Sequence, residues 1–310
     1  MTAVSDELRA VGEALGSRAQ RNAPLGARTT YRVGGTAALL VEPEDENELL
    51  EVAGAIGGVP VPVLVIGRGS NLLVADRGFA GLAVALGAGF EAIEIDGNQV
   101  VAGAAVSLPV LARRSAAAGL SGLEWAVGVP GSVGGAVRMN AGGHGSDTAA
   151  TLVGYRWVDL RTATASEAPA ARLEMAYRHT SLAPSDVVVA ARFRLAPGDP
   201  GQGAATIADI VKWRRANQPG GSNAGSVFTN PEGDSAGRLI EAAGLKGFRL
   251  GSAEVSPKHA NFIQADEGGS ADDVVRLIAH VQATVEATSG VTLSTEVCMV
   301  GFDSPSSVGR

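Results

Sequence analysis

Apolar residues recur at helical spacing in six stretches of the chain. In the first, Leu8, Val11 and Leu15 fall on one face, which predicts a helix over 5–18 with Ser5 as its N-cap. A second helix is predicted to begin near Asp45. The remaining helices are predicted over 107–118, over a stretch that runs through Trp213, over 234–243 and over 270–288.

Shorter apolar runs predict strands. They cover 61–66, 90–95, 99–104, 153–160, 187–195 and 291–300. Asp96-Gly97, between the second and third runs, is a favoured two-residue turn of a β-hairpin. In the last run the apolar residues alternate, and Glu296 falls on the opposite face. The chain has more predicted strands than a regular alternation of strands and helices would contain, so the order predicts an α+β fold of two or three subdomains. The segment 197–203, rich in Gly and Pro, is the predicted linker.

The glycine content changes this picture most. The chain has 42 glycines and 14 prolines among 310 residues, a share below that of low-complexity sequence. Hydrophobic residues make up 45% of the chain, which is enough for sizeable cores. The glycines are therefore expected at tight turns and at close approaches of the backbone.

The charge is negative and uneven. A net charge of −7 argues against a general nucleic-acid or anionic-membrane surface, so neither nucleic-acid binding nor membrane insertion is expected. Residues 201–260 nevertheless carry seven Lys and Arg against five Asp and Glu, so an anionic ligand would be held there by local groups. The single cysteine, Cys298, fits a reducing compartment, and we expect a cytoplasmic protein.

Several common site motifs are absent from the sequence. It has no G-x-G-x-x-G, no P-loop, no H-E-x-x-H and no G-x-S-x-G. The four histidines and one cysteine have no metal-ligand spacing, so no metal site is expected.

Two loops dense in glycine remain as candidates for a binding site. The first glycine loop covers 67–71 and the second covers 128–135. Glycines allow successive backbone N–H groups to converge on an anion, so the pair predicts a diphosphate site; either loop alone is equally typical of a tight turn.

Taken together, short segments spread over about 22–301 resemble the UDP-N-acetylenolpyruvoylglucosamine reductase family. They are 30–35, 67–73, 122–124, 129–136, 139–142, 177–178, 213–215, 218–219, 225–228, 230–231, 236–240, 258–262 and 296–297. The resemblance implies reduction of UDP-N-acetylglucosamine enolpyruvate to UDP-N-acetylmuramate for peptidoglycan. It implies NADPH as hydride donor and non-covalent FAD as the carrier, and we expect a monomer.

The resemblance also implies a domain plan. It has an FAD-binding part of the PCMH (vanillyl-alcohol-oxidase) type, with α+β subdomains over 20–86 and 87–203, the second including a return strand over 291–301. A C-terminal α+β substrate-binding domain follows over 204–290.

The same resemblance assigns the site residues. Arg178 would meet the negative charge of an enolate, Ser226 would donate a proton, and Glu296 would orient the arginine–substrate contact or a water. Implied cofactor contacts are Tyr31, Gly67, Arg68, Gly69, Ser70, Asn71, Leu72, Gly128, Pro130, Gly131, Ser132, Gly134, Gly135, Asn140, Gly145 and Arg238. Implied substrate contacts are Gln218, Asn230 and His259.

The chain departs from the family pattern at several positions. No tyrosine follows Tyr177, so it resembles the shorter subtype without a tyrosine-bearing loop. Gln218 stands where the longer subtype has a lysine, and Cys298 stands where relatives often have arginine. His144 stands where relatives usually have an aromatic residue, and we interpret it as a packing or ring contact.

Two other functions are compatible with these residues. One is an oxidase of the same fold acting on a sugar or hydroxy acid, which would react fast with oxygen. The other is a flavin- or nucleotide-binding protein without catalysis. Arg178, Ser226 and Glu296 together favour the reductase.

Overall fold

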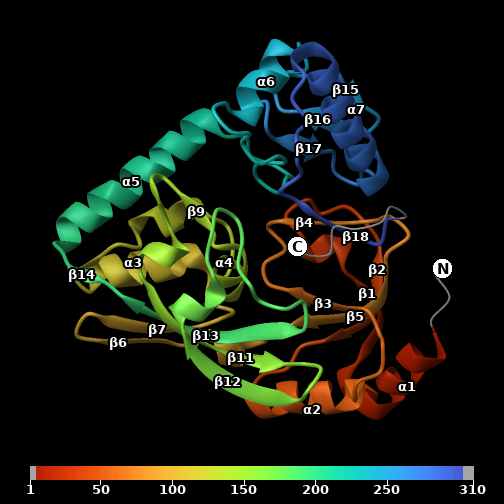
Figure 1. Cartoon of the computed structure of the whole chain (residues 1–310), viewed down its shortest axis with the longest axis vertical. Coiled ribbons are helices and arrows are strands. Elements are labelled where there is room, and N and C mark those ends of the chain that lie inside the picture. The colour runs from red at the N-terminus through yellow and green to blue at the C-terminus, as the bar shows by residue number, and fades with distance from the viewer. Residues whose placement is uncertain (1–4, 303–310) are drawn as a thin grey trace.

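The structure is a computed structural model that describes residues 5–302, and it has three parts (Figure 1). Two subdomains lie side by side in the lower half of the view, and the C-terminal domain lies above them. The long helix α5 (Pro200–Asn217) runs along the upper left edge from the second subdomain to the C-terminal domain. Within 5–302, no helix is long and apolar enough to cross a membrane.

The first subdomain is a four-stranded sheet covered by two helices. Its elements are α1 (Asp6–Leu15), β1 (Gln20–Pro24), β2 (Thr36–Val41), α2 (Glu46–Ile56), β3 (Val63–Ile66), β4 (Leu72–Val74) and β5 (Phe79–Ala85). The sheet order is β1-β2-β5-β3, with β1 antiparallel and the other pairs parallel. Ser5 and Asp45 cap α1 and α2 as predicted, and the apolar faces of both helices lie in one core with Leu39 and Leu82.

The second subdomain is a five-stranded antiparallel sheet with helices packed against it. Its main elements are β6 (Ile93–Asp96), β7 (Gln99–Gly103), α3 (Leu108–Ala117), α4 (Val133–Met139), β11 (Leu152–Asp159), β12 (Thr164–Pro169) and β13 (Asp186–Arg194). Short strands are β8 (Leu120–Ser121), β9 (Gly142–Gly143), β10 (Ser146–Asp147) and β14 (Ala196–Pro197). The sheet order is β12-β11-β13-β7-β6, and the predicted hairpin at Asp96-Gly97 is confirmed.

The predicted linker at 197–203 is wrong, because a helix begins inside it. Asp199 accepts a hydrogen bond from the Gln202 N–H (2.8 Å) and caps α5, and Pro200 occupies the first turn, where a missing N–H costs nothing. Ile207 on this helix is buried in the core of the second subdomain. The predicted domain boundary between 203 and 204 therefore falls within α5.

The C-terminal domain packs two helices on a small antiparallel sheet. Its elements are α6 (Ala236–Ala242), β15 (Arg249–Leu250), β16 (Ala253–Val255), β17 (Ile263–Ala265) and α7 (Ala271–Ser289). Val274, Leu277, Ile278, Val281 and Val285 form the buried face of α7, which confirms the helix predicted over 270–288.

The strand predicted over 291–300 is mostly wrong. Only β18 (Cys298–Val300) is a strand, and it pairs in parallel with β4 of the first subdomain, not with the second subdomain to which the return strand was assigned. Leu293 and Val297 are buried as the alternation predicted. The backbone before β18 instead bonds to residues 227–229 of the C-terminal domain, so no ladder forms there.

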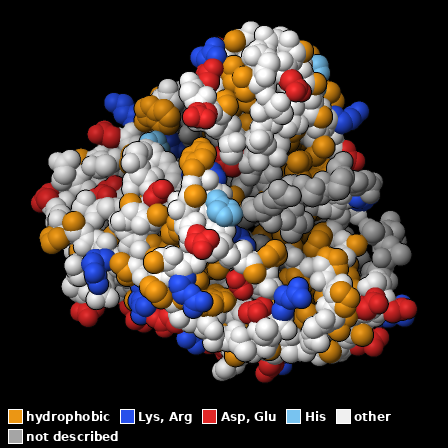
Figure 2. Space-filling view, viewed as in Figure 1, with side chains coloured by type: hydrophobic (Ala, Val, Ile, Leu, Met, Phe, Trp, Pro, Cys, Tyr) orange, Lys and Arg blue, Asp and Glu red, His pale blue; other side chains and the backbone are white. Residues whose placement is uncertain are grey.

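On the face shown in Figure 2, Lys and Arg side chains are scattered among acidic ones and do not gather into one basic patch. An anionic ligand on this face would have to be held by particular side chains and backbone groups.

Candidate active site

The two glycine loops face each other between β3 and the start of α4. A Cβ on Gly67 would lie 2.4 Å from Ser132 Oγ, which is closer than atoms can approach. A Cβ on Gly131 would lie 3.5 Å from Ser70 Oγ, an ordinary contact. Ser132 is buried and caps α4 by accepting from the Gly135 N–H (3.4 Å). The two loops thus lie close together, and we call the space between them the cradle; that it holds a diphosphate stays a prediction.

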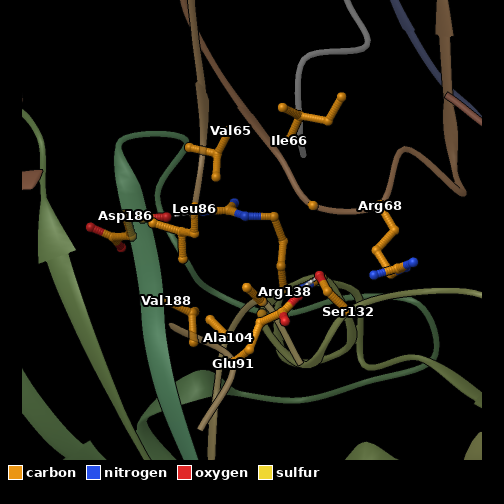
Figure 3. A pocket seen from close by; sticks show the side chains of 14 residues that line it. Val65, Ile66, Arg68, Leu86, Glu91, Ala104, Ser132, Arg138, Asp186 and Val188 are labelled. Carbon is orange, nitrogen blue, oxygen red and sulfur yellow. Dashed lines mark hydrogen bonds between the residues drawn. The ribbon is translucent and has the colours of Figure 1, made fainter. Parts of the chain in front are cut away.

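An open pocket beside this cradle has a cavity volume of about 150 Å³ (Figure 3). Apolar side chains such as Val65, Leu86 and Val188 form its walls. Arg68, Glu91, Ser132, Arg138, Asp186 and three glycines, Gly67, Gly134 and Gly135, supply its polar lining. Flat apolar walls next to exposed backbone and a few polar groups fit the adenosine diphosphate part of FAD.

Arg138 is a residue of this pocket that the sequence interpretation missed. Its guanidinium donates to the Ala183 carbonyl (2.9 Å) and to the Asp186 carbonyl (2.5 Å). Burial lowers the pKa of Arg138, and the nearby carboxylate of Asp186 opposes this shift. Its place three residues after Gly135 on a short helix was the only sequence signal for it.

Other predicted cofactor residues lie around the cradle. Gly69 and Leu72 are buried, and Asn71 bonds to the returning C-terminal segment. Tyr31 is fully buried, its hydroxyl has no partner in the described chain, and burial raises the pKa of Tyr31. Pro130 and Gly145 are exposed, so their cofactor contacts stay predictions.

Two predicted cofactor residues are engaged elsewhere. Asn140 uses its side chain to hold the protein together: Nδ2 donates to the Ala176 carbonyl (3.0 Å), and Oδ1 accepts from the Ala149 N–H (3.0 Å). Arg238 is exposed on α6 and forms an ion pair with Asp234. Among residues 5–302, Arg238 makes no hydrogen bond or ion pair with either glycine loop, so its cofactor role also stays a prediction.

Arg178 and Glu296, which are 118 residues apart, meet as a side-chain pair. Arg178 Nε donates to Glu296 Oε1 at 2.6 Å, and Nη2 donates to the Gly142 carbonyl at 3.2 Å. The two side chains are only 24% and 15% exposed. A turn closed by Ala176 and His179 holds Arg178 at φ 56°, a left-handed conformation that few non-glycine residues adopt.

Opposing influences act on the Glu296 carboxyl. Burial is the larger influence, so the pKa of Glu296 is raised overall, and the positive charge of Arg178 with its hydrogen bond only partly opposes this. Removal of the guanidinium would therefore leave the carboxyl with a still higher pKa.

Backbone hydrogen bonds bring Ser226 to the same place. The Glu296 N–H donates to the Val227 carbonyl (2.8 Å), directly after Ser226. The side chain of buried Asn261 binds the backbone of Phe228 twice: it accepts from the Phe228 N–H (3.0 Å) and donates to the Phe228 carbonyl (2.8 Å). The Ser226 hydroxyl has no side-chain hydrogen bond within the part of the chain that the structure describes, so it is available to a ligand.

Comparison with known proteins now identifies the family. The family model "UDP-N-acetylenolpyruvoylglucosamine reductase, C-terminal domain" matches residues 217–300, and "FAD binding domain" matches 37–167. The reductase of Synechococcus sp. (strain WH7803) is 44% identical over 292 residues, covering 92% of this chain and 94% of that protein. Reductase 2 of Symbiobacterium thermophilum is 42% identical over 310 residues, covering 98% of both. The chain belongs to the UDP-N-acetylenolpyruvoylglucosamine reductase family.

A solved structure of this family has the same fold. The reductase from Thermus caldophilus superposes with a TM-score of 0.80 at 34% identity, covering 91% of this chain and 99% of that one. The expected PCMH-type FAD-binding part joined to a C-terminal α+β domain is therefore confirmed, as are the family and its FAD dependence.

The structure splits the three predicted substrate contacts of this reductase-family chain between two places. Asn230 Oδ1 accepts from the Ala236 N–H (3.1 Å), and a Cβ on Gly237 would lie 3.4 Å from His259 Cε1, so Asn230 and His259 meet at the start of α6. Burial lowers the pKa of His259. Gln218 lies apart from them, at the end of α5.

At that end of α5, Gln218 orients an arginine that the sequence interpretation did not assign. Arg214 Nε donates to Gln218 Oε1 at 2.7 Å. Burial lowers the pKa of Arg214, and no carboxylate among the described residues pairs with it. A half-buried, unpaired guanidinium is costly unless an anion meets it. The one sequence signal was its position four residues before Gln218, one helical turn away.

His144 packs as the sequence interpretation expected. Its ring contacts Trp213 edge-on, with centroids 5.3 Å apart. A Cβ on Gly128 would lie 2.7 Å from the same ring, so this glycine leaves room for the imidazole, whose pKa is lowered by burial and by Arg214.

Proposed function

We propose that this chain reduces the enolpyruvyl double bond of UDP-N-acetylglucosamine enolpyruvate with NADPH, through FAD, to give UDP-N-acetylmuramate. The observation that carries the proposal is the Arg178–Glu296 pair, held next to the Ser226 loop by backbone bonds. The cradle of the two glycine loops, where Gly67 leaves room only for backbone, supports FAD as the cofactor. Bound FAD supplies a hydride acceptor and donor.

Arg178 is proposed to stabilise the negative charge that develops on the substrate. Hydride addition to the methylene carbon leaves the electrons of the double bond delocalised into the carboxylate as an enolate. A guanidinium fixed by Glu296 and the Gly142 carbonyl can meet that charge without reorganising. Glu296 acts by holding this guanidinium in place.

Ser226 is proposed to donate the proton that the neighbouring carbon receives. A serine hydroxyl is a weak acid, so it serves only a strongly basic carbanion at short range. Its freedom from other side-chain hydrogen bonds in the described chain fits this task.

Arg214 is proposed to contact the substrate diphosphate. Gln218 is neutral and can only donate an amide N–H to the phosphate oxygens, whereas the guanidinium that it orients carries a full charge. Asn230 and His259 remain our proposed neutral contacts at the other edge.

The test is oxidation of NADPH by the purified yellow protein with and without the enolpyruvyl substrate. We expect sustained NADPH oxidation, and one molecule of UDP-N-acetylmuramate per NADPH, only when both are present. Rapid turnover with oxygen alone would instead support an oxidase, and no turnover with bound FAD would support a binding protein. We further propose that the protein is a cytoplasmic monomer. Size-exclusion chromatography with light scattering measures its mass in solution and so tests whether it is a monomer.

A further inference from the structure

We infer that Asn71 is a positioning residue that ties the first glycine loop to Glu296, so that the flavin-binding loop sets the geometry of the catalytic carboxylate. This inference rests on the proposed function, because it gives Glu296 its task. Asn71 and Glu296 are 225 residues apart, and the side-chain amide of Asn71 donates to the Glu296 carbonyl at 3.0 Å.

The backbone of Asn71 makes a second bond to the same segment. The Cys298 N–H donates to the Asn71 carbonyl at 3.0 Å, where β18 begins its pairing with β4. One residue of the flavin-binding loop therefore holds the chain on both sides of Val297. The bond from the Cys298 N–H needs only the backbone carbonyl of residue 71, but the bond to the Glu296 carbonyl needs an amide side chain there.

The Glu296 peptide is held from its other side by the proton-donor loop. Its N–H donates to the Val227 carbonyl (2.8 Å), while its carbonyl accepts from Asn71. Residues before Glu296 are held by the C-terminal domain, where the Thr229 N–H donates to the Ser294 carbonyl (3.0 Å), but among the described residues it is the Asn71 amide that bonds to the Glu296 carbonyl itself. A rotation of this peptide would move the carboxylate away from Arg178.

The orientation of the Arg178 guanidinium depends on that carboxylate. Arg178 Nε has Glu296 as its partner, and the pair is mostly buried, where misplacement is not compensated by water. Displacements of about 1 Å at a reacting centre cost roughly 10²-fold in rate. Loss of the Asn71 amide should therefore slow the step that uses Arg178 more than it slows hydride transfer from NADPH.

The experiment compares Asn71→Ala and the isosteric Asn71→Asp with the control Asn98→Ala, an exposed turn residue outside the site. Stopped-flow absorbance of the FAD-loaded protein follows flavin reduction by NADPH and reoxidation by the enolpyruvyl substrate separately. For both Asn71 variants we expect the FAD-loaded protein to show reoxidation slowed by roughly 10–10²-fold more than its flavin reduction is slowed. Equal slowing of both half-reactions would overturn the inference, because it would make Asn71 a flavin ligand only.

A double-mutant cycle decides whether the effect passes through Glu296. If it does, Asn71→Ala combined with Glu296→Gln reoxidises no more slowly than Glu296→Gln alone. If the fold-reductions in reoxidation rate caused by Asn71→Ala and Glu296→Gln multiply in the double variant, the inference is overturned.

A readout independent of activity is hydrogen exchange in the FAD-loaded protein. The Glu296 amide, bonded to Val227, should exchange faster in Asn71→Ala than in wild type and Asn98→Ala, and unchanged exchange would overturn the inference. Wild-type protein that is not reoxidised by the enolpyruvyl substrate would refute the proposed function, and hydrogen exchange would then still decide whether Asn71 positions the Glu296 segment.

Discussion

The cofactor end of the site is built mainly from backbone, whereas the substrate end is built from side chains that several distant segments bring together. Two loops, 67–71 and 128–135, supply the cradle, and their fit depends on the absence of a side chain at Gly67. Arg178 comes from a turn after the second subdomain's sheet edge, Ser226 from the C-terminal domain, and Glu296 from the returning segment. Damage to the first end should affect binding of FAD, and damage to the second should affect one chemical step.

The strongest test of this difference is Ser226→Ala. Flavin reduction by NADPH needs no proton from Ser226 and should stay near the wild-type rate. Reoxidation by the enolpyruvyl substrate should slow by ~10²–10⁴-fold, the range for a positioned general acid, or roughly 3–5 kcal/mol of transition-state stabilisation. Stopped-flow absorbance separates the two half-reactions.

Ser166→Ala, on β12 in the second subdomain, serves as the matched control and should leave both half-reactions unchanged. Reoxidation of Ser226→Ala at the wild-type rate with saturating substrate would show that the donor is another group. The contrast between the two ends of the site would then rest on Arg178 and Glu296 alone.

Substrate binding should respond to Arg214→Ala. Loss of a charged hydrogen bond to the diphosphate, worth about 1.5–3 kcal/mol, should raise KM for the enolpyruvyl substrate by roughly 10–150-fold with little change in kcat. Steady-state kinetics at saturating NADPH measure this. The adjacent, exposed Arg215→Ala is the control, and equal KM values for the two variants would place the diphosphate elsewhere.

The sequence predicts the cofactor end better than the substrate end for a physical reason. A backbone cradle needs glycines close together in the chain, and both loops carry that local signal. Arg178 and Glu296 meet through tertiary packing, and no local pattern marks either one; the family resemblance assigned them. Arg214 and Arg138 were missed because a charge becomes functional only through its burial and its lack of a carboxylate partner, or through its place in a pocket.

Errors in the fold have a similar origin. The segment 197–203 is rich in Gly and Pro, yet Pro is favoured in the first turn of a helix and Asp199 supplies the cap, so α5 begins there. The alternation over 291–300 correctly predicted that Leu293 and Val297 are buried, whereas Val291 and Met299 are only partly buried. A strand also needs a neighbouring strand, and within the described chain β4 provides one beside Cys298–Val300. The local helix and hairpin signals at 5–18 and 90–104 needed no distant partner, and both are confirmed.

The cofactor end should respond to Gly67→Val. The new Cβ meets Ser132 Oγ at 2.4 Å, and overpacking of about 1–3 kcal/mol should weaken FAD binding by roughly 10–100-fold. Fluorescence titration of the apoprotein with FAD measures the affinity. Once saturated with FAD, the variant should reoxidise at a rate close to wild type, in contrast to Ser226→Ala.

Two glycine controls separate steric strain from cofactor contact. Gly54→Ala, in open space on α2, should leave FAD affinity unchanged. Gly131→Ala meets the protein at an ordinary 3.5 Å, so any loss of affinity there measures contact with FAD itself. Unchanged affinity in Gly67→Val would remove the first loop from the flavin site.

The smallest effect concerns two histidines whose pKa burial lowers, the half-buried His259 and the more exposed His144. Burial lowers the pKa of His259 in the C-terminal domain and of His144 beside Gly128. The unfolded chain, with an ordinary histidine pKa of about 6.5, therefore takes up a proton that the folded protein excludes. The stability that neutral imidazole contributes is present above that value and is lost as pH falls through the folded pKa.

We expect the free energy of unfolding, measured by urea denaturation of the FAD-loaded protein, to fall from pH 7 to pH 5. His259→Gln should reduce this slope by at most about 1.4 kcal/mol per pH unit because it removes one titrating group, and His144→Gln should reduce it by less because solvent screens the exposed imidazole. A slope unchanged in both variants would mean that carboxylates alone cause the loss, and a change in only one would show which end of the site excludes the proton.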